Sequence, residues 1–220
     1  MSLIFTGLAI LMIGDSHLYT RGGLESRLHD ELMDRGAKVY SYGACGSPAG
    51  DWATTSHPPC GKTSRIESHG IEREEGADST TPPLSELIER HHPNLIIVVN
   101  GDTMASYKTP VMPSPWIAKQ VSLLTKTIQD AELRCIWIGP TWGSEGGKFG
   151  KTQARTQEIS DFLADNVAPC DYINSLGLSR PGEFSTVGWD GQHLTERGYN
   201  QWVQAIAKKM ETMNVSAATI

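Results

Sequence analysis

The chain has 220 residues, of which 39% are hydrophobic and 20% charged, and it fits one globular domain over residues 1–220. A formal net charge of −6 and the lack of a basic cluster with interleaved aromatic residues give no reason to expect nucleic acid or an anionic membrane as partner. The longest apolar stretch, around residues 8–13, is too short to span a bilayer.

Apolar runs alternate with helical periodicities along the chain, which predicts an α/β fold. Strict alternation of strand and helix favours a parallel sheet with helices on both faces. Strands are predicted at residues 8–13, 38–42, 94–100, 134–139 and 171–174. Helices are predicted at residues 24–35, 84–92, 114–130, 152–166 and 195–213.

Three stretches interrupt this alternation: residues 43–83, 101–113 and 140–151. Each of them directly follows a predicted strand. In an open parallel sheet, ligands bind at the carboxyl ends of the strands, so these stretches are candidates to surround a site. We expect the polar segment 61–83 to be a solvated insertion, with a lid over substrate as the alternative.

The four cysteines bear on the compartment in which the protein works. Cys45 and Cys60 flank a Gly/Pro-rich loop, and we predict a disulfide between them, with two unpaired thiols as the alternative. Such a bridge implies an oxidising compartment, hence a periplasmic or secreted protein, although a cytoplasmic one is not excluded. Cys135 and Cys170 lie at the starts of predicted strands and either pair or remain buried thiols.

The first strand ends in the sequence IGDSH, which places Ser16 at the carboxyl edge of the sheet. A serine hydroxyl is a poor nucleophile unless a base lies within hydrogen-bond reach. Near the far end of the chain, GWDGQH puts Asp190 three residues before His193. That spacing lets the carboxylate hold Nδ1 of the imidazole while Nε2 faces the serine. Either motif alone also fits an ordinary helix entry, but the combination is more specific.

These motifs resemble those of the SGNH hydrolases, the GDSL esterase/lipase superfamily. IGDSH, YSYGACG and DGQH are similar to its first, second and fifth blocks. The resemblance implies Ser16 as nucleophile, His193 as base and Asp190 as its orienting carboxylate. It also implies that the backbone N–H groups of Ser16 and Gly46 form an oxyanion hole. The implied fold is a flavodoxin-like three-layer α/β/α sandwich with a five-stranded parallel sheet of order 2-1-3-4-5.

The third block departs from the family pattern, in which an asparagine completes the oxyanion hole. In NGDTM, Thr103 occupies that position and Asn100 lies three residues earlier. Either Thr103 offers a hydroxyl or Asn100 reaches the site by a local shift. Asp102 is the weakest candidate, because a carboxylate beside a developing oxyanion is unfavourable. A lost donor costs about 10²–10³ in rate.

Other residues are weaker candidates. Trp52, Trp142 and Trp189 lie in or beside the loops at the expected site, where they either stack on a sugar or anchor the loops. The side chain of His17 is expected to point away from Ser16 and to be structural. No metal ion or organic cofactor is expected, since no ligand cluster or phosphate-binding motif occurs.

The sequence therefore predicts a serine esterase that forms an acyl-enzyme on Ser16. The expected substrates are short-chain esters, above all acetyl esters, including O-acylated glycans of a bacterial cell surface or wall. Two alternatives remain open. One is an O-acyltransferase that uses the same three residues with a sugar hydroxyl as acceptor. The other is a non-catalytic glycan-binding domain on the same fold.

Overall fold

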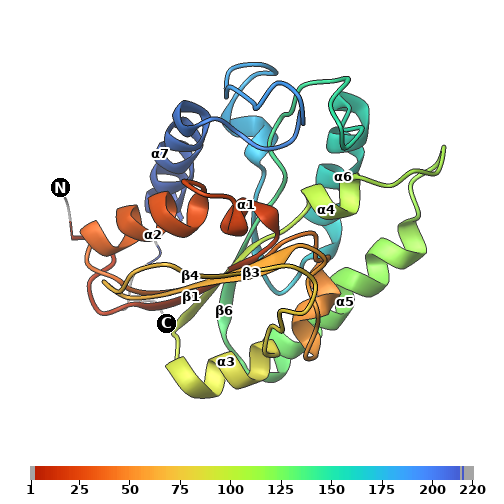
Figure 1. The fold of residues 1–220 in the computed structure, drawn as a ribbon. Helices are drawn as coiled ribbons and strands as arrows, with labels where there is room; N and C mark the ends of the chain where they lie inside the picture. The colour runs from red at the N-terminus through yellow and green to blue at the C-terminus, as the bar shows by residue number, and fades with distance from the viewer. Residues whose placement is uncertain (1–2, 214, 216–220) are drawn as a thin grey trace.

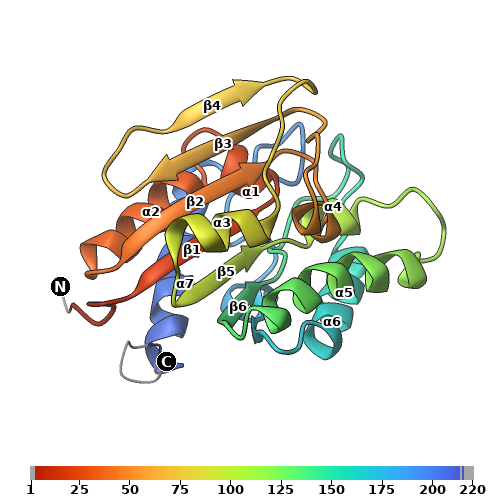
Figure 2. The ribbon, with the colours of Figure 1, turned by 90° about the horizontal axis from the view of Figure 1, so that it is seen from below.

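A central β-sheet lies between two layers of helices (Figure 1). The computed structural model describes residues 3–213 and 215. The sheet has seven strands in the spatial order β4-β3-β2-β1-β5-β6-β7. Figure 2 shows this order from β4 to β6. The strands are β1 (Ala9–Gly14), β2 (Lys38–Ala44), β3 (Gly61–Ile66), β4 (Glu72–Glu75), β5 (Leu95–Val99), β6 (Arg134–Ile138) and β7 (Asp171–Ile173).

The longer helices divide between the two faces of the sheet. Helices α2 and α7 pack on one face, and α3, α5 and α6 pack on the other. The helices are α1 (Ser16–Tyr19), α2 (Leu24–Asp34), α3 (Leu84–His91), α4 (Asp102–Ala105), α5 (Ser114–Asp130), α6 (Gln153–Asn166) and α7 (Glu196–Thr212), with the short 3₁₀ helices η1 (Ala49–Ala53) and η2 (Ser175–Leu178). The predicted three-layer α/β/α architecture is confirmed.

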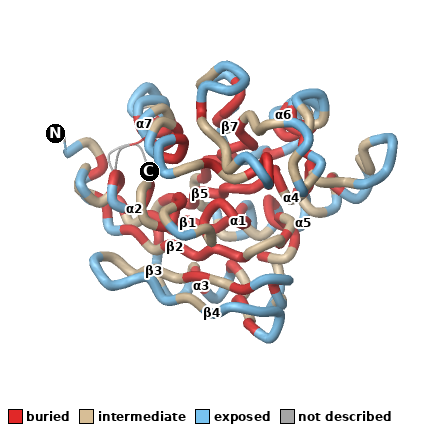
Figure 3. Tube along the Cα trace, turned by 45° about the horizontal axis from the view of Figure 1, so that its top comes forward, coloured by how far each residue is buried: buried red, intermediate tan, exposed pale blue. Residues whose placement is uncertain are grey.

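Strand β1 shows why the sheet lies at the centre. Successive side chains of a strand point to opposite faces, so a strand that is apolar on both faces needs cover on each. Ile10 and Met12 join the core under α2 and α7, whereas Leu11 and Ile13 join the core under α3, α5 and α6. All four side chains are fully buried. The buried segments in Figure 3 accordingly run through the middle of the molecule, and exposed segments lie at its rim.

The five predicted strands occur as β2, β1, β5, β6 and β7, in the predicted order and parallel to one another. The expectation of a solvated insertion at residues 61–83 is wrong for part of that segment. Strands β3 and β4 form there, antiparallel to their neighbours, and extend the sheet at the β2 edge. Their sequences, GKTSRI and EREE, are polar, so hydrophobic periodicity did not reveal them.

Two disulfides fasten the strands. Cys45 pairs with Cys60, with 5.3 Å between their Cα atoms, and ties the end of β2 to the start of β3. Cys135 pairs with Cys170, with a Cα–Cα distance of 4.6 Å, and links β6 to the residue before β7. In the described part of the chain, no helix combines the length and apolar character needed to cross a membrane.

Candidate active site

The turn after β1 presents Ser16 at the carboxyl edge of the sheet. Gly14 ends the strand, and a Cβ atom there would lie 2.3 Å from the carbonyl oxygen of Val99 on β5, so only glycine permits this close approach. The Asp15 carboxylate then accepts a hydrogen bond from the backbone N–H of His17 at 3.1 Å and caps α1. Helix α1 therefore begins at Ser16, whose position is fixed by the strand before it and the cap beside it.

A chain of hydrogen bonds joins Ser16, His193 and Asp190. Ser16 Oγ lies 2.7 Å from His193 Nε2, and His193 Nδ1 lies 2.9 Å from Asp190 Oδ2. The other carboxylate oxygen of Asp190 accepts the backbone N–H groups of Gln192 at 2.8 Å and His193 at 2.9 Å. The carboxylate is thus held by its own turn and orients the imidazole toward the serine.

The surroundings of His193 favour its neutral form. Burial lowers the pKa of the imidazole from the ordinary value of 6.5, the neighbouring His17 acts in the same direction, and Asp190 opposes them. The two imidazole rings are 5.4 Å apart between centroids. A neutral imidazole with Nε2 directed at a hydroxyl can accept the proton of that hydroxyl.

A small cavity of about 150 Å³ opens beside the Ser16 hydroxyl. Ligand pockets for drug-sized molecules usually measure about 300–1,000 Å³, so this cavity suits a small group. The edge of the Phe149 ring contacts the His193 ring at a centroid distance of 5.7 Å. The lining consists of Ser16, Cys45, Gly46, Cys60, Thr103, Ser106, Phe149, Gln192 and His193, so the disulfide between the two cysteines forms part of the wall.

Two backbone N–H groups are available at this cavity. Gly46 has a φ of +78°, in the left-handed region that glycine adopts without strain. Within residues 3–213 and 215, the N–H groups of Gly46 and Ser16 have no hydrogen-bond acceptor in the protein. Ser16 and Gly46 both line the cavity, so their N–H groups are candidates to donate to an oxygen atom bound there.

The structure separates the two side chains proposed as a further donor. Asn100 is buried away from the cavity, and its Nδ2 donates to the carbonyl of Ser47 at 3.1 Å. The expectation that Asn100 reaches the site is therefore wrong, because its amide is engaged in supporting the neighbouring turn. Thr103 lines the cavity, and its hydroxyl is 3.4 Å from Asp15 Oδ2, a long and weak contact.

The three tryptophans have different surroundings. Trp52 is 1% exposed and packs in the core under η1, so it cannot stack on a substrate. Trp142 is half-buried, and its indole N–H points to the carbonyls of Leu176 at 3.0 Å and Ser179 at 3.1 Å, which anchors its loop. Trp189 is 68% exposed and adjoins Asp190. The predicted stacking role therefore remains open only for Trp189.

A second histidine–carboxylate pair lies behind the first. His17 Nε2 is 2.5 Å from Asp102 Oδ2, and His17 Nδ1 is 2.9 Å from the Tyr199 hydroxyl. Lys151 Nζ is 2.5 Å from the other oxygen of Asp102. The His17 ring therefore contacts Tyr199 and Asp102, and it belongs to a buried charged cluster that the sequence did not reveal.

Three cavity residues were missed in the sequence. Gln192 stands inside the DGQH motif, so its place next to His193 was a usable signal. Ser106 follows α4, and its hydroxyl lies 3.0 Å from Gln192 Oε1 and 2.9 Å from the carbonyl of Asp102. Phe149 lies in a glycine-rich loop without any motif, and only the folded chain brings it to His193.

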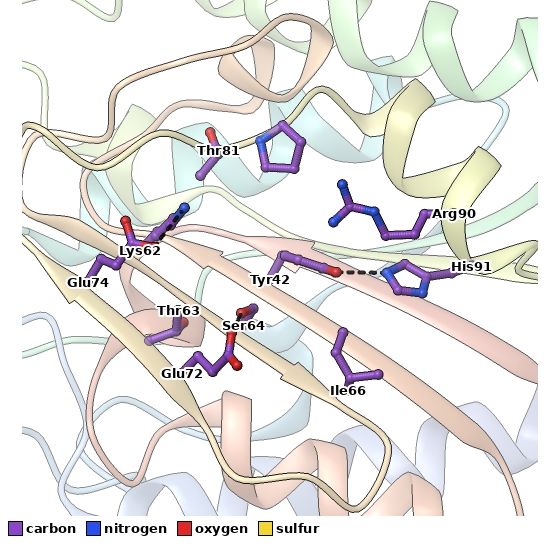
Figure 4. A pocket seen from close by; sticks show the side chains of 11 residues that line it. Tyr42, Lys62, Thr63, Ser64, Ile66, Glu72, Glu74, Thr81, Arg90 and His91 are labelled. Carbon is purple, nitrogen blue, oxygen red and sulfur yellow. Dashed lines mark hydrogen bonds and ion pairs between the residues drawn. The ribbon is translucent and has the colours of Figure 1, made fainter.

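A larger cavity, of about 290 Å³, lies against the face of β2, β3 and β4 beside α3 (Figure 4). His91 Nε2 there pairs with the Tyr42 hydroxyl at 2.7 Å, and Ser64 Oγ lies 3.4 Å from Glu72 Oε2. Because Ser64 and His91 have separate partners, this cavity lacks the hydrogen-bonded chain found around Ser16.

Among the described residues, no three His, Cys, Asp or Glu side chains gather in a group that could hold a metal ion.

The chain is 39% identical over 209 residues to protein BcsX from Komagataeibacter xylinus, an alignment that covers 94% of this chain and 78% of that protein. The chain belongs to the BcsX family. No protein-family model matches the sequence.

The fold of this BcsX-family protein is that of the SGNH hydrolases, as the sequence predicted. The lipase/acylhydrolase from Enterococcus faecalis superimposes with a TM-score of 0.60 at 14% identity, over 94% of this chain and 97% of that one. The acetyl xylan esterase AlAXEase superimposes with a TM-score of 0.56 at 13% identity, over 92% and 99%.

Proposed function

We propose that this protein is a serine esterase that transfers a short acyl group from an ester to Ser16 and then to water. One observation carries the proposal: Ser16 Oγ, His193 and Asp190 form a continuous hydrogen-bonded chain at the wall of a small cavity. Such a chain raises the reactivity of a serine hydroxyl. Enzymes named as esterases and acylhydrolases share this fold, which supports the assignment.

In the first step, Ser16 Oγ attacks the carbonyl carbon of the ester while His193 Nε2 takes the hydroxyl proton. The carbonyl oxygen becomes an oxyanion that accepts hydrogen bonds from the N–H groups of Ser16 and Gly46, with the Thr103 hydroxyl as a third donor. Asp190 stabilises the imidazolium. When the tetrahedral intermediate collapses, the bond to the alcohol oxygen breaks and His193 returns the proton to the leaving alkoxide.

In the second step, water attacks the acyl-enzyme. His193 removes a proton from the water, the same donors hold the second oxyanion, and the Ser16–acyl bond breaks. The proton then returns to Ser16 Oγ, and the carboxylic acid leaves. No metal ion or organic cofactor enters this sequence of steps.

The shape of the site favours an acetyl or similarly small acyl group. The cavity measures about 150 Å³, and the Cys45–Cys60 disulfide and Phe149 restrict its extent. Trp189, exposed next to Asp190, offers an aromatic face outside the cavity. An indole face suits the apolar face of a sugar ring, so we propose an O-acylated glycan of a bacterial cell surface or wall as substrate. The acetyl xylan esterase shows that this fold can serve such chemistry.

We also propose that the protein works in the periplasm or outside the cell. Its four cysteines form two disulfides. Structural disulfides persist in oxidising compartments and are rare in the cytosol. Reduced and oxidised forms of protein isolated from the native compartment can be distinguished by thiol labelling of Cys45 and Cys60. Complete labelling without reductant would contradict the proposal.

Hydrolysis of p-nitrophenyl acetate by wild type, Ser16→Ala and Ser122→Ala tests the esterase. Ser122 lies exposed on α5, so Ser122→Ala is the matched control. We expect turnover by wild type and the control, loss of turnover in Ser16→Ala, and a transient mass increase equal to one acetyl group only where Ser16 is present. Equal rates in all three proteins without an adduct would remove the esterase and favour the glycan-binding alternative. Acetyl transfer to an added sugar in preference to water would favour the acyltransferase.

A further inference from the structure

Four buried side chains from four segments meet behind the cavity. His17 comes from α1, Asp102 from α4, Lys151 from the loop before α6 and Tyr199 from α7. Each is at most 2% exposed. The Asp102 carboxylate is the centre of the cluster, since one of its oxygens binds His17 and the other pairs with Lys151. Tyr199 completes the chain through its contact with His17.

The members of this cluster adjoin the residues of the cavity in the sequence. His17 follows Ser16, Asp102 precedes Thr103, and Lys151 lies two residues after Phe149. The cluster therefore joins three segments that line the cavity. The loop that ends in Lys151 also supports the turn of Asp190, because Ser144 N–H donates to the Gly191 carbonyl at 2.8 Å and Lys148 N–H to the Trp189 carbonyl at 3.1 Å.

The cluster also carries charge close to the proposed oxyanion. Burial acts to raise the pKa of Asp102, but Lys151 and the hydrogen bond from His17 outweigh it and lower the pKa to about 2. Asp102 is therefore an anion at neutral pH. An unpaired carboxylate next to Thr103 would oppose the growth of negative charge in the cavity and would stabilise the protonated form of His193.

We propose that Lys151 is a positioning residue for the esterase reaction, which cancels the charge of Asp102 beside the oxyanion and anchors the loop that carries Phe149. The inference rests on the proposed function. The residue does not touch the reacting atoms: it acts on them through Asp102 and through the charge that His193 experiences. Nothing in the sequence around Lys151 distinguishes it from a surface lysine, yet it is 2% exposed.

Two substitutions that remove opposite charges test this role. Lys151→Met leaves Asp102 as an unpaired anion, whereas Asp102→Asn leaves Lys151 as an unpaired cation. The pH dependence of kcat/KM for p-nitrophenyl acetate rises as His193 loses its proton. We expect the midpoint of this rise to move up by about 0.5–1 pH unit in Lys151→Met and down by a similar amount in Asp102→Asn. We also expect Lys151→Met to lower kcat by about 10-fold or more.

The double variant and a surface control complete the test. In Asp102→Asn/Lys151→Met neither charge remains, and the midpoint is expected to return close to that of wild type. Lys126→Met removes an exposed lysine that pairs with Asp130 on α5 at 2.9 Å, and it is expected to leave the midpoint and kcat unchanged. Shifts in the same direction in both single variants, or no shift in either, would overturn the proposal.

Charged and titratable groups other than this cluster also face His193. They are Asp190, which binds its Nδ1, and Asp15, which interacts with it electrostatically, and both stay in place in all four variants.

Should Lys151→Met fail to fold, a comparison of Asp102→Asn with the double variant still measures the effect of the lysine charge. NMR titration of the His193 imidazole reads the same shifts without turnover. Absence of Ser16-dependent turnover in wild type would refute the esterase, whereas unshifted His193 titrations would refute the role of Lys151.

Discussion

Two histidine–carboxylate pairs lie side by side at the end of the sheet, and only one of them faces the cavity. His193–Asp190 has a serine hydroxyl at its free nitrogen and a cavity beside it. His17–Asp102 has a buried phenol at its free nitrogen and a lysine on its carboxylate. In both pairs the imidazole and the carboxylate lie within hydrogen-bond reach, so the pairing of an imidazole with an acid does not itself mark a catalytic group.

What separates the two pairs is access and charge balance. The first pair opens onto a cavity, so in the proposed reaction His193 can exchange a proton with Ser16 and with a bound ester. In the second pair both nitrogens of His17 lie against protein partners, and Asp102 Oδ1 forms an ion pair with Lys151 Nζ, although these two atoms make no hydrogen bond. A buried network whose members face only protein groups fixes structure, whereas a hydrogen-bonded chain that opens onto a cavity can take part in a reaction.

The largest difference between the two pairs is expected when His193 and His17 are replaced in turn, because one replacement lowers activity and the other lowers stability. His193→Gln removes the base, and we expect kcat/KM for p-nitrophenyl acetate to fall by about 10⁴-fold or more while the melting temperature changes little. His17→Gln breaks a buried, charge-assisted network, and we expect a loss of about 2 kcal/mol or more of unfolding free energy. Steady-state kinetics and thermal unfolding of both variants measure these effects. A melting temperature that falls equally in both variants would erase the distinction between the pairs.

An intermediate effect is expected from Asp190→Asn. The amide keeps the size of the side chain but holds the imidazole in the wrong tautomer, so we expect kcat to fall by about 10³–10⁴-fold with little change in KM. Rate measurements on p-nitrophenyl acetate check this. A loss under about 10-fold would mean that a group other than Asp190 orients His193.

The smallest effect concerns the pH at which activity appears. Burial and the nearby His17 lower the pKa of His193 from its ordinary 6.5. The protonated imidazole cannot act as base, so kcat/KM is expected to rise with pH and to reach half its maximum below pH 6.5. A pH–rate profile with a neutral ester measures the midpoint. A midpoint above that value would show that attraction to Asp190 and Asp102 outweighs burial.

The contact between His193 and Asp190, and its neighbour Ser16, could be predicted from the sequence because these residues lie in short, recognisable motifs. Ser16 follows a buried strand in a short motif, and Asp190 and His193 are three residues apart before a helix. The parallel order of the five apolar strands could be predicted for a similar reason, since long hydrophobic runs dominate the choice of central strands. These features depend on residues close together in the chain.

The contact between His17 and Asp102 could not be predicted, because the two residues are far apart in the chain and no sequence motif links them. Asp102 at the start of α4 and Lys151 in the loop before α6 are brought together only by the folding of the chain. Trp52 was misjudged for a related reason: its loop position suggested access, but η1 turns the indole into the core. Strands β3 and β4 carry mostly polar residues, so their pairing is set by the neighbouring strand β2 rather than by their own periodicity.

The bridge between Cys45 and Cys60 joins two roles that are separate in most proteins. It ties the β3–β4 hairpin to the parallel sheet, and its two cysteines line the cavity beside Ser16. The hydrogen bonds among Ser16, His193 and Asp190 involve neither cysteine, whereas the wall beside them includes both. The redox state of one pair of cysteines therefore bears on the shape of the cavity next to Ser16 as well as on the attachment of the hairpin.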